Sequence, residues 1–265
     1  MSRAIGVLLI GLIIAALAAP ALAPYPPDRI DLASMRRPPS TIHWLGTDDL
    51  GRDVFARVMA GARVSLAVGL LSAAVAGATG VAIGGAAGYL GGAADAVLMR
   101  GTDAMLAVPR LPLLMIAAAL LQPSVALLVV FIGLTGWMET ARVVRAEFRT
   151  LRSRGFVESA RAAGAGHLRI VVAHLLPNAA QPAVVSITLA VARAILLESA
   201  LSFFGVGVRP PQASWGNMLY QSQATMSTAP WLALAPGVFI VLTTVTVNLA
   251  GERAFNRSRA GYRPA

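Results

Sequence analysis

The stretch ESARAAGAGHLRIVVAHLLPN, residues 158–178, is polar and lies between two strongly apolar regions of the chain. It holds Gly164 and Gly166 between two segments with helical patterning, and Pro177 follows near its end. Glycine and proline are the residues that most strongly interrupt helices. The stretch therefore predicts a short helix over 155–163, a turn at the glycines, and a second helix over 167–176, which Pro177 either stops or leads into the next apolar segment.

The composition of the whole chain is typical of a membrane protein. Of its 265 residues 57% are hydrophobic and 13% are charged, whereas soluble domains carry about 25% charged residues. There is no cysteine, which excludes disulfides, thiol nucleophiles and cysteine metal sites. All 22 basic residues are arginine, so a phosphate-loop lysine and a lysine general base are excluded too. If the protein takes part in an ATP-driven process, another chain must hydrolyse the ATP.

Six apolar segments are each long enough to cross a bilayer as a helix, which takes about 20 residues. They cover residues 4–23, 64–90, 102–121, 125–144, 179–205 and 231–251. The first could instead be a cleaved signal peptide, but its apolar run is longer than such peptides carry, and we favour a retained helix. Pro109 and Pro112 interrupt the third segment. Since open backbone is not tolerated in lipid, the predicted fold is an all-α integral membrane protein with six transmembrane helices.

Residues 24–61 between the first two segments are polar. They predict an extended loop followed by a short amphipathic helix over 54–59, separate from the second span. We therefore divide the chain into residues 1–61, with the first span, this loop and this helix, and residues 62–265, the core membrane domain. In the second span, small residues recur every four positions, which predicts close helix packing on one face. They are Ser72, Ala76, Gly80, Gly84, Gly88 and Gly92.

Arginine placement gives the topology. The net charge of +10 is gathered in blocks between apolar runs, which favours cytoplasmic loops over nucleic-acid binding. Seven arginines lie at the end of the fourth span and in the stretch that leads to the fifth: Arg142, Arg145, Arg149, Arg152, Arg154, Arg161 and Arg169. With four more in the tail, they place both termini in the cytoplasm. The first loop is an exception, because its five arginines would lie outside, offset by five aspartates: Asp28, Asp31, Asp48, Asp49 and Asp53.

The fifth span carries two charged residues, Arg193 and Glu198. A charge at the bilayer centre costs about 2.5–3.5 kcal/mol on insertion scales, so such residues usually face protein or water. Five positions apart on a helix they point about 140° away from each other, which argues against a simple internal pair. Either they line a polar path, or they form structural pairs with a partner subunit; the sequence leaves both readings open.

The opening stretch resembles a known signature. Glu158, Ala160, Gly164, Leu176 and Pro177 match the EAA…G…LP pattern of the membrane subunits of ABC importers. Ser159 stands where the family has alanine, and His174 where it often has isoleucine. Residues 43–66, HWLGTDDLGRDVFARVMAGARVSL, and residues 200–219, ALSFFGVGVRPPQASWGNML, resemble the peptide-transporter branch. The chain is thus similar to the C-type permease subunit of dipeptide and oligopeptide importers.

The resemblance implies a type I importer permease fold with a cytoplasmic coupling helix in the loop 145–177. Gly164 is expected to permit the sharp turn, because a Cβ is penalised where φ is positive. The residues expected to contact or orient an ATPase are Glu158, Ala160, Arg161, Gly164, Ala165, His167, Leu176 and Pro177. Arg193, Glu198 and Ser202 are expected along the translocation path.

The same resemblance implies the partners. They are a second, B-type permease subunit, two ATPase subunits that hold ATP and magnesium, an extracytoplasmic substrate-binding protein and a peptide substrate. The expected location is the bacterial inner membrane. No catalytic residue, cofactor, metal site or nucleic-acid partner is expected in this chain. The resemblance does not choose among dipeptides, oligopeptides, glutathione, nickel complexes and haem.

Two other classes of function are weighed against this reading. An ion-gradient-driven secondary transporter could use Arg193 and Glu198 as a relay, and its uptake would survive the loss of any ATPase. An intramembrane enzyme is the weaker alternative, because no span holds an acid and base pair suited to catalysis and no GxSxG elbow is present.

Overall fold

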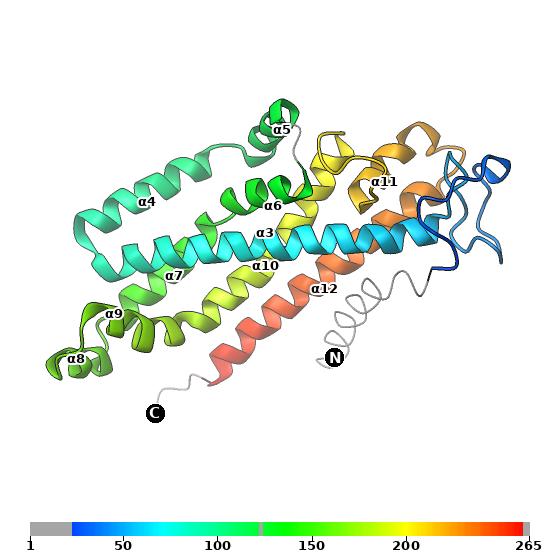
Figure 1. Ribbon diagram of the computed structural model, residues 1–265. Helices are drawn as coiled ribbons and strands as arrows, with labels where there is room; N and C mark the ends of the chain where they lie inside the picture. The colour runs from blue at the N-terminus through cyan, green and yellow to red at the C-terminus, as the bar shows by residue number, and fades with distance from the viewer. Residues whose placement is uncertain (1–22, 122–123, 262–265) are drawn as a thin grey trace.

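The computed structural model describes residues 23–121 and 124–261, with side chains described as far as Arg253. Three long helices run side by side along the molecule: α3 (Val54–Leu90), α10 (Leu176–Phe203) and α12 (Trp231–Gly261) (Figure 1). Two bent pairs complete the bundle, α4 (Gly92–Ala107) with α5 (Arg110–Leu121), and α6 (Val125–Leu134) with α7 (Met138–Leu151). In the described ranges the chain is helical apart from its loops and one isolated β-bridge between Thr47 and Asp53.

Three helices of the described chain are long and apolar enough to cross a membrane, or five spans if each bent pair counts as one. The crossing helices are Val54–Leu90, His167–Phe203 and Trp231–Arg253. The described part of the chain is therefore an all-helical membrane protein. The predicted first span, residues 4–23, lies almost wholly outside the described residues, so the predicted count of six stays a prediction.

The prediction of a separate short helix over 54–59 is wrong, because α3 runs without a break from Val54 to Leu90. Asp53 begins the helix by accepting a hydrogen bond from the Ala56 amide at 2.8 Å. Arg57, whose charge suggested a surface helix, is buried against the loop that precedes α3. The charge is thus accommodated by tertiary contacts, and the helix has no reason to end before its apolar part.

Both bent pairs break inside a predicted span. α4 and α5 meet at 78° around Val108 and Pro109, where Val108 has the extended backbone that a following proline favours. Pro112 lies in the first turn of α5, where a missing N–H is tolerated. α6 and α7 meet at 44°, with Gly136 in the connection. The sequence predicted the first break from its prolines but treated the segment 125–144 as one span.

Gly80, Gly84 and Gly88 of the small-residue stripe pack against α7, as the repeat predicted, whereas Ser72 contacts α6 and Gly92 lies in α4 and faces open space. A Cβ on Gly84 would lie 2.8 Å from Cα of Ala141, and one on Gly88 would lie 2.7 Å from the carbonyl oxygen of Arg145. The two backbones therefore approach each other more closely than any larger side chain would allow.

A small helical hairpin lies between α7 and α10. It consists of α8 (Gly155–Ala162), a turn at Gly164, the short α9 (His167–Arg169) and a π-helical turn, η2 (Ile170–Leu175), that continues into α10. Pro177 opens the next helix and does not stop the previous one, because it occupies the second position of α10. The Leu176 amide donates a hydrogen bond to the Val171 carbonyl, and the Asn178 side-chain amide donates one to the His174 carbonyl at 2.6 Å. These backbone carbonyls near the proline therefore keep a hydrogen-bond partner.

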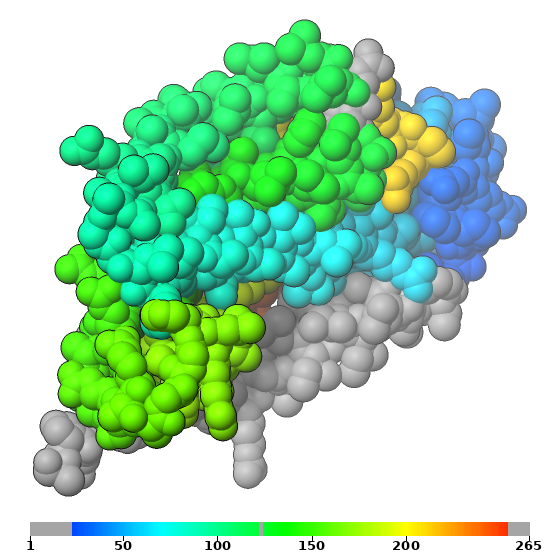
Figure 2. Space-filling model, turned by 60° about the vertical axis from the view of Figure 1, so that its left-hand side comes forward, coloured from blue at the N-terminus to red at the C-terminus, as the bar shows by residue number. Residues whose placement is uncertain are grey.

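The molecule has two differently built ends. Residues 23–53 and 205–230, the latter including α11 (Trp215–Ser222), form what we call the loop end, and residues 152–177 form the hairpin end. Figure 1 places α8 and α9 at one extremity of the bundle and the blue loop at the other, and Figure 2 shows the same separation from a second direction. The predicted placement of these two segments on opposite sides of a membrane is compatible with this geometry.

Candidate functional site: the hairpin and the charged residues of the bundle

The turn of the hairpin is a Schellman motif, the common way for a helix to end at a left-handed residue. Ala163 is the C-cap residue of α8, and Gly164 follows with φ of +82°. The Gly164 amide bonds the Arg161 carbonyl and the Ala165 amide bonds the Ala160 carbonyl, each at 3.0 Å. The expectation that Gly164 has positive φ is confirmed. The two hydrogen bonds join four of the predicted coupling residues, Ala160 with Ala165 and Arg161 with Gly164.

The hairpin has one buried apolar side, and its exposed surface carries both charged side chains and apolar ones such as Leu168 and Val172. Val157 is fully buried in a cluster with Phe148, Ile170 and Leu175, which fixes α8 against α7 and the start of α10. The other predicted coupling residues lie on the outside or are half-buried. Glu158, Arg161, Gly164, His167, Leu176 and Pro177 are exposed, and Ala160 and Ala165 are half-buried. Six of the eight residues thus lie on the hairpin, and Leu176 and Pro177 begin α10 directly after it.

Contacts with α3 and α7 support the hairpin from behind. The Tyr89 hydroxyl lies 2.6 Å from Nδ1 of His167, and the Arg152 guanidinium donates to the Tyr89 carbonyl at 2.9 Å. Near the same end, Arg145 makes a two-point ion pair with Asp95, which joins α7 to α4. Sequence reasoning missed these supports, because the partners lie 50 to 78 residues apart and carry no local signal.

Arg193 and Glu198 have different surroundings. Arg193 pairs with Glu139 of α7, and both side chains are partly exposed. Glu198 is fully buried: its carboxylate accepts hydrogen bonds from Ser65 at 2.9 Å and from Ser202 at 2.7 Å. The two charges of α10 therefore make separate contacts, and each has a partner within this chain.

Glu198 and Ser202 hold the segment that follows α10. The Ser202 hydroxyl accepts from the Val208 amide at 3.0 Å, and the Ser65 hydroxyl accepts from the Trp215 amide at 3.3 Å. Through these hydroxyls one carboxylate connects α3, α10 and the return segment 205–215. Of the three residues that the sequence assigned to the translocation path, only Arg193 is open to the surface of the chain.

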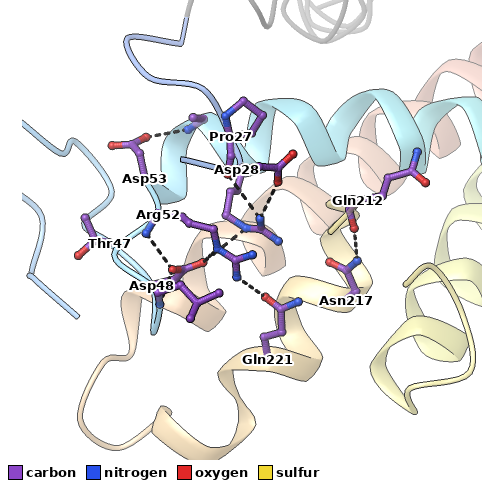
Figure 3. A network of polar contacts seen from close by, with 12 residues as sticks. Pro27, Asp28, Thr47, Asp48, Arg52, Asp53, Gln212, Asn217 and Gln221 are labelled. Carbon is purple, nitrogen blue, oxygen red and sulfur yellow. Dashed lines mark hydrogen bonds and ion pairs between the residues drawn. The ribbon is translucent and has the colours of Figure 1, made fainter. Parts of the chain in front are cut away.

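The loop end is stabilised by a network of ion pairs and hydrogen bonds (Figure 3). Asp48 accepts from Arg52 at 2.7 Å and lies 3.6 Å from Arg57, which also reaches Asp28 at 3.3 Å. Arg52 further donates to Gln221 of α11 at 3.2 Å. The exceptional arginines Arg52 and Arg57 of the first loop are thus balanced by aspartates, as the charge pattern predicted. The Asp53 carboxylate is hydrogen-bonded to the His43 ring, and it also accepts the Ala56 amide at the start of α3.

The fold and the hairpin together define a helical membrane protein that crosses the membrane several times and presents a folded polar segment at one end. Residues 80–259 match the protein family described as binding-protein-dependent transport system inner membrane component, which is more than half of the chain. The chain belongs to this family. Its members are the permease components of ABC transporters, which are not themselves the catalytic subunits. The resemblance found in the sequence is confirmed.

Curated relatives agree with this assignment. A protein of Brucella suis biovar 1 named as a peptide permease is 43% identical over 248 residues, which cover 93% of this chain and 82% of the relative. A second Brucella suis protein, named as a permease of a peptide transport system, is 38% identical over 246 residues, 93% of this chain and 83% of the relative. The oligopeptide transport system permease protein OppC of Mycobacterium bovis is 37% identical over 243 residues, 91% of this chain and 84% of the relative. The ion-gradient-driven carrier finds no support in these matches.

Proposed function

We propose that the chain is one permease subunit of an ATP-driven importer for dipeptides, oligopeptides or related small solutes. The names of the relatives support the solute class. The chain forms half of the translocation path, and a second permease subunit forms the other half. Two ATPase subunits with ATP and magnesium bind at the hairpin end, and an extracytoplasmic binding protein delivers the solute at the loop end. Both termini then lie in the cytoplasm of a bacterium, whose inner membrane holds the complex.

The observation that carries this proposal is the hairpin, which is exposed on its outer face and rigidly supported behind. Its turn is fixed by the Schellman hydrogen bonds, and Val157 anchors α8 in the apolar cluster. From His167 the chain continues as helix through η2 into α10. A displacement of the hairpin by an ATPase is therefore transmitted along α10, and through Tyr89 to α3.

ATP can drive this movement only if it binds the two states of the complex with different affinity. Closure of the ATPases around ATP shifts the hairpin, and the packed helices pass the shift to the path. In this mechanism Arg193 lies on the path. Glu198 and Ser202 act indirectly, since both are buried, by holding the segment 205–215 against α3 and α10.

The test uses the complete transporter in liposomes, with solute-stimulated ATP hydrolysis as the readout. Glu158→Lys and Gly164→Trp are expected to abolish the stimulation, because they change the exposed face and the turn, while the permease still inserts into the membrane. Glu252→Lys and Gly101→Trp are matched controls: Glu252 is exposed on α12, and Gly101 faces open space on α4. Wild-type stimulation in both hairpin variants would contradict the proposal.

A further inference from the structure

The breaks in the two bent helix pairs come together at mid-height of the bundle, beside α10. A narrow crevice there is lined by Arg110 at the start of α5, Gly136 between α6 and α7, and Arg193 of α10. The α3 residues beside it are Ser72, Ala73 and Ala76, and Ser72 is the middle residue of the 37-residue α3. The crevice therefore lies about halfway along the longest membrane-crossing helix.

The crevice holds more positive than negative charge. Arg193 pairs with Glu139, but none of the ion pairs among the described residues includes Arg110. The Nε of Arg110 is buried and has no hydrogen-bond partner. Of the two guanidinium groups, only that of Arg193 is paired with a carboxylate, and Arg110 has no acid of its own.

The neighbours of Arg110 in the crevice include no acidic side chain. A Cβ on Gly136 would lie 3.2 Å from Nη2 of Arg110, so the guanidinium lies directly against the break between α6 and α7. Most of the other residues lining the crevice are apolar: Ala73, Ala76, Ile132, Ala190 and Ala194. The Ser72 hydroxyl already donates to the Val129 carbonyl at 3.1 Å. The residues that line the crevice thus offer Arg110 no carboxylate.

The cluster is open on one side. The Arg193 side chain is 38% exposed and that of Glu139 is 43% exposed. Charged side chains at this height do not face lipid tails, since exposure to them costs about 2.5–3.5 kcal/mol or more per group. The open side therefore faces either a water-filled path or a partner subunit. Arg110 also begins α5, and the positive end of a helix dipole further favours an anion at this position.

We propose that Arg110 and Arg193 form a binding site for the carboxylate of the transported solute, which for a peptide is its C-terminal carboxylate. Arg110 donates to the carboxylate, Arg193 adds positive charge beside it, and Glu139 orients Arg193. Discontinuous helices whose N-termini point at anionic solute groups form midplane sites in other transporters. This inference rests on the proposed function, since it names the part of the solute that the path recognises.

The test compares one peptide with a free C-terminal carboxylate and the same peptide with a C-terminal amide. Uptake of each is measured in liposomes with the complete transporter, at concentrations that saturate the binding protein. Arg110→Gln and Arg193→Gln are the variants. Arg142→Gln is the matched control, because Arg142 pairs with Asp103 on the exposed surface of the same helix pairs. The binding protein is the same in every arm, so its own preference cancels when variants are compared.

The expected result is that Arg110→Gln lowers the preference for the free carboxylate about tenfold, as the loss of a charged hydrogen bond would do. Arg193→Gln should lower it in the same direction, and Arg142→Gln should leave it unchanged. Uptake of the amide should change little in any variant, since the amide lacks the recognised charge.

Three results would overturn the inference. The first is an unchanged ratio of free-carboxylate uptake to amide uptake in Arg110→Gln. Both peptides could lose uptake equally while the complex stays assembled, which would make the arginines structural. Or the variants could fail to co-purify with the second permease subunit, which would mean that an acid of that subunit neutralises them. If the wild type imported neither peptide, the proposed function itself would fall, and this inference with it.

Discussion

The two ends of the molecule differ in where their side chains find partners. At the loop end, Trp215 is fully buried and its indole donates to the Val58 carbonyl at 3.0 Å, while Arg57 is buried among aspartates. At the hairpin end, the outer face of α8 and the turn are exposed, and a Cβ added at Gly155, Gly164 or Gly166 would meet no atom within 4 Å. The loop end thus buries its large core residues within its own chain, although Ile30, Leu32, Ile42 and Trp44 stay exposed there, whereas the turn of the hairpin end packs against nothing on its outer side.

The difference is also visible in the glycines. A Cβ on Gly216 would lie 2.6 Å from Cα of Ser199 and 2.7 Å from Cβ of Ser202, so α11 touches α10 with no space between them. Gly164 is needed for a different reason, because its φ of +82° suits only glycine well. Gly216 thus serves close packing between two helices, and Gly164 serves a turn. Substitutions at the two ends should therefore have very different costs.

The largest expected difference is between two aromatic residues. Trp215→Ala should destabilise the permease by about 3–5 kcal/mol, because it removes a fully buried indole and its hydrogen bond. Phe156→Ala, on exposed α8, should cost about 1 kcal/mol or less. The thermal midpoint of the detergent-purified transporter measures both. Equal losses would show that the hairpin is as tightly built as the loop end.

A smaller contrast is expected between two glycines. Gly216→Ala should cost about 1–3 kcal/mol, since the new methyl group meets backbone and side-chain atoms of α10 that cannot move away. Gly155→Ala, in the first turn of α8 and facing open space, should cost nothing and could gain up to about 1 kcal/mol from helix propensity. The same melting experiment compares them. A stable Gly216→Ala variant would mean that α11 can separate from α10 without loss.

The smallest effect is expected at the support of the hairpin. Tyr89→Phe removes the hydrogen bond to His167 and should cost about 0.5 kcal/mol, because the pair is accessible to water. The readout is faster amide hydrogen exchange in residues 164–175, with the global melting temperature nearly unchanged. Tyr220→Phe is the control, since Tyr220 is half exposed on α11 at the other end. Unchanged exchange in Tyr89→Phe would show that packing alone holds the hairpin.

Local features of the hairpin were predictable because they depend on residues close in sequence. The predicted helix over 155–163 corresponds to α8, and the glycine turn lies where the sequence placed it. The break at Pro109 was predictable for the same reason, since proline acts on its own backbone. The break near Gly136 was not, because one glycine in an apolar segment is a weak signal. The false end of the helix at 59 arose from the polar composition of residues 24–61, because the partners that bury Arg57, Asp28 and Asp48, lie outside the helix.

The sequence by itself determined that the chain is a helical membrane protein, where most of its spans lie, and which polar segment joins the fourth and fifth. Hydrophobic runs, missing residue types and glycine or proline positions act locally, so a single chain displays them. Only the tertiary structure decided how each charge is used. Arg57 is neutralised by its own chain, Glu198 is enclosed by serines, and Arg110 meets Arg193 across 83 positions without an acid of its own. Such contacts depend on how distant helices pack, and no local pattern records them.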